Sequence, residues 1–133
     1  FETYDNLRFK KDVVFTGRVS TEELRDIFGA AYGLTFVPFF EGFGIPILEA
    51  FQSDTPVITS AATSMPEVAG EAALLTDPYS VDSIAEAMKK IANNSELRQT
   101  LIEAGRKQKL LFSWEQTSAK LWNCIEKVLE TKG

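Results

Sequence analysis

The sequence predicts an α/β fold, with a parallel sheet of about four strands, helices on both of its faces and a helical last third. Short apolar runs alternate with segments in which apolar residues recur at helical spacing, a pattern typical of a parallel sheet covered on both sides. Capping residues, Gly or Pro separate the two kinds of segment. The predicted strands are 13–17, 34–39, 55–60 and 73–76.

Three helical segments are predicted between these strands. Ser20 and Glu23 have the spacing of a capping box at the start of the first. The second covers 45–52, where Pro46 is tolerated because it falls in the first turn. The third is one turn that ends at Gly70. The buried face of the first helix is predicted to carry Leu24, Ile27, Phe28 and Ala31.

The last third is predicted to hold three helices, each preceded by a serine that can cap it. Trp114 and Trp122 are interpreted as packing residues. Helical spacing indicates that the last helix turns Leu121, Trp122, Ile125 and Leu129 inward, and the middle one Leu97, Leu101 and Ile102. Ile84, Ala87, Met88 and Ile91 are predicted to share a face of the first. Ser80 is predicted to cap a helix over 81–92, and Ser95 a helix from 96 to about 111. Ser113, in a capping box with Gln116, is predicted to cap a helix that ends at about 129.

Composition excludes several classes of function. The 133 residues suit one domain, and a net charge of −5 disfavours a nucleic-acid surface. The chain has no histidine and one cysteine, Cys124, which argues against a disulfide scaffold, His-based chemistry and a metal site. No apolar run approaches the ~18 residues of a membrane span. A cytoplasmic location is therefore expected, and the first residue, Phe1, indicates a piece of a longer protein.

The segment Glu41 to Ala50 reads EGFGIPILEA and follows the predicted strand 34–39. A strand that ends in a glycine-containing turn and leads into a helix forms an anion site, because free backbone N–H groups and the positive end of the helix dipole converge there. Glu41 and Glu49, with seven residues between them, are the candidate polar side chains of this segment.

This segment, together with TPVITS, MPEVAGEAALLTDP, FSW and the earlier VVFTGRVSTEEL, resembles the C-terminal domain of GT-B retaining glycosyltransferases. Their Glu–seven residues–Glu motif corresponds here to Glu41 and Glu49, and the resemblance covers about residues 13–120. It implies a truncated, doubly wound, Rossmann-like sheet. Residues 1–133 would then be one partial domain that binds the nucleotide-diphosphate sugar.

The resemblance also implies roles for individual residues. Glu49 would bind the ribose hydroxyls, and Glu41 would face the donor sugar as the catalytic residue. The backbone amides of Gly42, Phe43 and Gly44 would lie near the sugar and the phosphates. The turn Gly17-Arg18-Val19 is similar to the loop that contacts the nucleobase, although Arg18 could equally be a solvated charge. No metal or cofactor is implied, and the donor is expected to be a UDP-sugar or a GDP-sugar.

Departures from the family pattern shape the remaining expectations. The family's Arg and Lys pair that grips the diphosphate has no counterpart, so the chain alone is expected to be inactive. Phe39 stands where a Ser is usual, Gly33 replaces a usual Asp, and Asp54 replaces a usual Gly in a turn.

The predicted strands also suggest how the chain could associate. If 13–17 and 34–39 are the third and fourth strands of a doubly wound sheet, the strands between them are missing. The free edge of 34–39 would then allow a dimer. The missing N-terminal domain would bind the acceptor and could give peripheral membrane association.

Two alternatives stay open at this point. One is a non-catalytic, flavodoxin-like interaction or signalling domain, for which the length is suitable. The other keeps the GT-B fold with different chemistry, as in a sugar-nucleotide epimerase or a phosphorylase.

Overall fold

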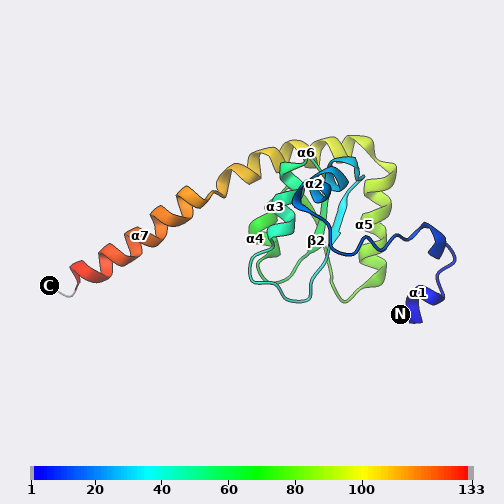
Figure 1. The fold of residues 1–133 in the computed structure, drawn as a ribbon, viewed down its shortest axis with the longest axis horizontal. Helices are drawn as coiled ribbons and strands as arrows, with labels where there is room; N and C mark the ends of the chain where they lie inside the picture. Colours follow the sequence, from blue (N-terminus) through cyan, green and yellow to red (C-terminus); the bar gives the residue numbers. More distant parts are fainter. Residues whose placement is uncertain (1, 132–133) are drawn as a thin grey trace.

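A computed structural model describes residues 2–131, and their centre is a sheet of three parallel strands. The strand order is β1-β2-β3, with Leu34 opposite Val57 and Val57 opposite Ala73. The sheet thus has the predicted parallel α/β architecture with one strand fewer than expected (Figure 1). The strands are β1 (Leu34–Phe36), β2 (Val57–Ser60) and β3 (Ala73–Thr76).

Helices cover both faces of this sheet. All four residues of β2 are buried, and successive side chains of a strand point to opposite faces, so both faces must be covered. Val57 packs against α3 (Ile45–Gln52) and α4 (Met65–Ala69). Ile58 packs with residues of α5 (Val81–Asn93) and α6 (Ser95–Gln108). In Figure 1, α3 and α4 lie on one side of the strands and α5 on the other.

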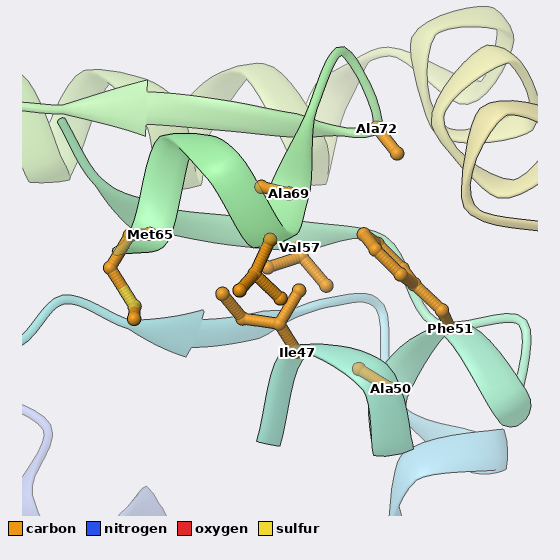
Figure 2. Packing of buried hydrophobic residues seen from close by; sticks show 8 residues of the cluster. Ile47, Ala50, Phe51, Val57, Met65, Ala69 and Ala72 are labelled. Atoms are coloured by element: carbon orange, nitrogen blue, oxygen red, sulfur yellow. The ribbon is translucent and has the colours of Figure 1, made fainter. Parts of the chain in front are cut away.

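The larger core cluster lies on the side of α3 and α4. Its central side chains, Ile47, Phe51, Val57 and Met65, are at most 2% exposed. Figure 2 shows them pointing toward one another from α3, β2 and α4. Phe51 also lies against α6, since a Cβ added at Gly105 would be 2.8 Å from its Cδ1.

The first predicted strand does not form. Residues 13–17 run as an exposed segment without strand structure before α2 (Thr21–Ala30), and Val14 is 79% exposed. A strand needs a neighbour for its backbone N–H and C=O groups, and no other strand of the described residues lies beside this segment. Before it lie only α1 (Glu2–Asp5) and the 3-10 helix η1 (Lys10–Asp12).

Two of the predicted helix starts are confirmed. Ser20 and Glu23 form the capping box, with Ser20 N–H donating to the Glu23 carboxylate at 2.7 Å and lowering its pKa. Ser80 accepts from Ser83 N–H at the start of α5.

One other start differs from the prediction, and one capping box is incomplete. Asn94, rather than Ser95, caps α6, accepting from Leu97 N–H at 2.9 Å. The prediction stopped at Ser95 because sequence alone can place an N-cap one residue off. Ser113 is the predicted N-cap of the last helix and accepts from Gln116 N–H, but the Gln116 side chain donates to the Leu110 carbonyl instead of completing a capping box.

The last helix, α7 (Trp114–Glu130), follows the 3-10 helix η2 (Lys109–Leu111) and projects away from the sheet (Figure 1). None of its residues is buried, and Trp114 is 83% exposed. The prediction of an inward apolar face and of packing tryptophans was therefore wrong, because helical spacing shows that apolar residues share a face but not that anything covers it. Ile27 and Met88 are also exposed, unlike the rest of their predicted faces. The large apolar residues left exposed on α7 are Trp114, Leu121, Trp122, Ile125, Val128 and Leu129.

Asp54 and Gly33, which both depart from the family pattern, fit the backbone and the neighbours at their positions. Asp54 has a φ of 55°, in the left-handed region, and its carboxylate receives two hydrogen bonds from Arg106, at 2.9 and 2.7 Å. The turn after α3 thus does accept Asp in place of Gly, as expected. At Gly33 a Cβ would lie 3.1 Å from both the Pro56 carbonyl oxygen and the Ile91 side chain. A larger residue would push α5 away from the start of β1.

Candidate functional site

The loop between β1 and α3 contains the candidate residues Glu41 to Gly44. Gly44 is the N-cap of α3 and has a φ of 103°, which side chains other than Gly rarely adopt. A Cβ at this position would also lie 2.6 Å from Cε of Met65, which is fully buried in α4. Gly44 therefore places the loop directly against α4.

Two hydroxyl residues before α4 hold this loop from the other side. The Ser64 hydroxyl donates to the Glu41 carbonyl at 2.7 Å and lies 3.2 Å from the Phe43 carbonyl. Glu41 N–H donates to the Thr63 hydroxyl at 3.4 Å, and Thr63 has a φ of 53°. Sequence reasoning missed these two residues, because their contacts with Glu41 and Phe43 join positions more than twenty residues apart. The Ser64 side chain makes no capping bond to α4.

The Phe43 ring packs edge-on against the Phe112 ring, with centroids 5.8 Å apart. Phe112 directly follows η2, the 3-10 helix after α6, so the glycine loop contacts the chain just beyond that helix. The loop is thus held at both Glu41 and Phe43 by residues distant in sequence. It is preformed rather than dependent on a ligand for its shape.

The N-terminus of α3 keeps its hydrogen-bond donors available. No side chain caps this helix, and within residues 2–131 the backbone N–H groups of Gly42, Phe43 and Gly44 donate no hydrogen bond. These amides precede the positive end of an eight-residue helix. The arrangement can bind an anionic group, as the sequence predicted.

Glu49 lies in α3, half-buried, and lines a shallow cavity of about 180 Å³ between α2 and α3. Glu41 is also half-buried, in the loop before the helix. The cavity brings Glu49 beside the polar side chains of Thr21 and Arg25. It therefore offers a carboxylate acceptor and several donors to a hydroxyl-bearing ligand. Its lining residues are Thr21, Leu24, Arg25, Phe28, Glu49, Gln52 and Ser53.

The turn Gly17-Arg18-Val19 lies just before α2 and is exposed except for Val19, which is half-buried. Gly17 has a φ of 65°, consistent with a turn. Because 13–17 is not a strand, this turn does not follow a strand of the sheet. No hydrogen bond in the described part of the chain joins it to the Glu41 loop. It does lead into Thr21, which lines the Glu49 cavity.

Two absences hold for residues 2–131. No group of three or more His, Cys, Asp or Glu side chains could hold a metal ion there. No helix in that range is both long and apolar enough to cross a membrane.

Comparison with known proteins gives a consistent set of relatives. Residues 2–108 match the family Glycosyl transferases group 1. The chain is 37% identical over 112 residues to O-antigen chain mannosyltransferase B of Escherichia coli. These aligned residues are 84% of this chain and 29% of that protein. It is 40% identical over 86 residues to O-antigen chain mannosyltransferase RfbU of Salmonella typhimurium, over 65% of this chain and 24% of that one.

A solved structure has the same fold. Sucrose-phosphate synthase from Thermosynechococcus elongatus superposes with a TM-score of 0.83 at 25% identity, over 98% of this chain and 33% of that one. The chain thus spans about a third or less of the length of these relatives.

Proposed function

Because the chain belongs to the glycosyl transferases group 1 family, we propose that it is the donor-binding part of an enzyme that transfers a sugar from a nucleotide-diphosphate sugar to an acceptor. The observation that supports this most directly is the preformed loop 41–44, in which the unpaired amides of Gly42, Phe43 and Gly44 precede the N-terminus of α3. Two half-buried carboxylates, Glu41 and Glu49, accompany it. A phosphate-bearing, hydroxyl-rich ligand matches both features.

Each part of the site has a role in this proposal. Glu49 accepts hydrogen bonds from the ribose hydroxyls in the cavity between α2 and α3. The amides of Gly42, Phe43 and Gly44 donate to the diphosphate and the sugar, and Gly17-Arg18-Val19 contacts the base. Glu41 faces the donor sugar, where its negative charge stabilises the positive charge that develops on the anomeric carbon.

The reaction breaks the bond between the anomeric carbon and the diphosphate oxygen, which leaves with the electron pair. An acceptor hydroxyl forms the new bond to that carbon and releases its proton, which the departing diphosphate can take. The helix N-terminus stabilises the negative charge growing on the leaving group. We propose retention of configuration, a UDP or GDP donor, and no cofactor.

Nucleotide binding tests this proposal. Calorimetric titration of the chain with UDP and with GDP is expected to show binding that Glu49→Gln weakens by roughly 10- to 100-fold, the value of a charge-assisted hydrogen bond of about 1.5–3 kcal/mol. Glu67→Gln is the matched control, because Glu67 is an exposed helix carboxylate in α4. Binding of neither nucleotide, or equal affinities for the two variants, would contradict the proposal. In the longer enzyme that contains this chain, NMR of the product from a donor sugar separates transfer from epimerisation.

A dimer through β1 is a second proposal about partners. Within residues 2–131 β1 pairs only with β2, so its other edge can accept a strand. Light scattering that finds only monomers at high concentration contradicts this.

A further inference from the structure

Two exposed aromatic rings meet at the carboxyl ends of the strands, outside the residues assigned above. Phe39 follows β1 by three residues, and Tyr79 follows β3 by the same number. Their ring centroids are 5.0 Å apart, with planes inclined by 37°. Since β2 lies between β1 and β3, this contact spans the end of the central strand. Phe39 is nevertheless 61% exposed and Tyr79 80% exposed, so most of both rings faces solvent.

The turn that carries Tyr79 is well fixed. Tyr79 N–H donates to the Asp77 carboxylate at 2.9 Å, and Ser80 N–H donates to the Asp77 carbonyl at 3.1 Å. Ser80 in turn caps α5. With the backbone held this way, only the two side-chain torsions of Tyr79 remain to be fixed on binding, so its contact area costs little conformational entropy. A flexible surface aromatic would not offer the same advantage.

The aromatic pair and the proposed nucleotide site lie toward opposite faces of the sheet. Glu49 belongs to α3, which packs on the face of the sheet that carries Val57. Tyr79 leads into α5, which packs on the opposite face with Ile58. In the sequence, Glu41 lies between Phe39 and Glu49. In sugar transfer the anomeric carbon lies between nucleotide and acceptor, so a surface away from the nucleotide site is open to the acceptor.

We infer that Phe39 and Tyr79 form a platform on which a sugar ring of the acceptor stacks. The inference rests on the proposed function. The C–H groups on one face of a pyranose pack against the negative face of an aromatic ring, and the Tyr79 hydroxyl can bond to a sugar hydroxyl at the rim. Two rings inclined to each other make a shallow angle that fits one ring of a saccharide. A nucleobase could also stack, but the Glu49 cavity places the nucleotide elsewhere.

The test measures saccharide binding separately from nucleotide binding. Aromatic carbon resonances of the isotope-labelled 133-residue chain are followed during titration with α-mannotriose and, separately, maltotriose. At least one of these two saccharides is expected to shift the Phe39 and Tyr79 resonances. Phe39→Ser and Tyr79→Ser should each weaken that binding at least fivefold, whereas Tyr79→Phe keeps most of it. Tyr32→Ser is the matched control, because Tyr32 is 68% exposed but precedes β1.

Each contrary outcome is distinct. Shifts of these two rings by UDP or GDP, with no effect of either saccharide, would assign the platform to the donor base and overturn the inference. An equal loss in the Tyr32 variant would show non-specific contact. Glu49-dependent nucleotide binding without any saccharide effect on the rings would refute the inference and leave the proposed function standing. Absence of nucleotide binding as well would refute both.

Discussion

Replacing Gly44 by alanine is expected to destabilise the fold and distort the candidate site, whereas the same change at Gly42 should not affect stability. The two glycines belong to one loop and differ in their surroundings. Gly44 has a φ of 103°, and a Cβ there would be 2.6 Å from the Met65 methyl carbon. Gly42 has no atom within 4 Å of its Cβ position and does not have a positive φ. Gly42→Ala is therefore the matched control.

The expected cost at Gly44 has two parts. An L-residue in a left-handed conformation costs about 1–2 kcal/mol. Overpacking a buried contact costs about 1–3 kcal/mol, toward the lower end here because the group in contact is the mobile end of a methionine. Together Gly44→Ala should lower the free energy of unfolding by about 2–4 kcal/mol, a large share of the roughly 5–15 kcal/mol of a typical domain. Gly42→Ala should stay within about 0.5 kcal/mol of the original protein.

Urea unfolding monitored by circular dichroism measures both variants, with an unchanged slope as the check that only stability has altered. A double-mutant cycle with Met65→Ala separates the two parts, because in that background Gly44→Ala should cost only the backbone part, about 1–2 kcal/mol. Equal midpoints for Gly44→Ala and Gly42→Ala would refute the reasoning. A cost unchanged by Met65→Ala would show that the contact with α4 contributes nothing. Gly42→Ala should nevertheless weaken nucleotide binding, since the added methyl group would lie in open space beside an amide that donates to the ligand in the proposed function.

Two further predictions concern stability. The hydrogen bonds from Arg106 hold the pKa of Asp54 below its usual value. The pair therefore stabilises the fold fully above the unfolded-state pKa, about 3.9. This stabilisation is lost as the pH falls through the lower pKa of the folded state. The difference in urea midpoint between the original protein and Arg106→Gln should therefore shrink between about pH 5 and pH 2, and a constant difference would contradict the assignment. On α7, Leu121→Ala should change the free energy of unfolding by less than about 0.5 kcal/mol, whereas Phe51→Ala in the core should cost about 3–5 kcal/mol. A cost above about 1 kcal/mol for Leu121→Ala would show that this helix face is covered in solution.

Local patterns predicted most of the elements that position the candidate site. The strand 73–76 and the helix 45–52 have the predicted bounds, and the capping box at Ser20 forms as expected. These features depend on residues within about four positions, so the chain itself contains the information. The cap of α6 fell on Asn94 rather than Ser95, a shift of one residue between two good capping residues.

The sequence could not predict the features of the site that depend on contacts between residues far apart in the chain. The loop 41–44 is shaped by Ser64 and Met65, and these contacts depend on where α4 packs. The pairing of Asp54 with Arg106 joins residues 52 positions apart. The Phe39–Tyr79 contact spans three strands' ends and has no local signature.

By itself, the sequence determined that this chain alternates strands and helices, that a glycine loop precedes the helix 45–52, and that Glu41 and Glu49 lie in this segment. Only the tertiary structure decided which apolar segments are covered. The β-branched run 13–17 and the apolar face of α7 have the composition of buried elements, yet both are exposed. The physical reason is that periodicity and capping are properties of a segment, whereas pairing and burial require a second surface.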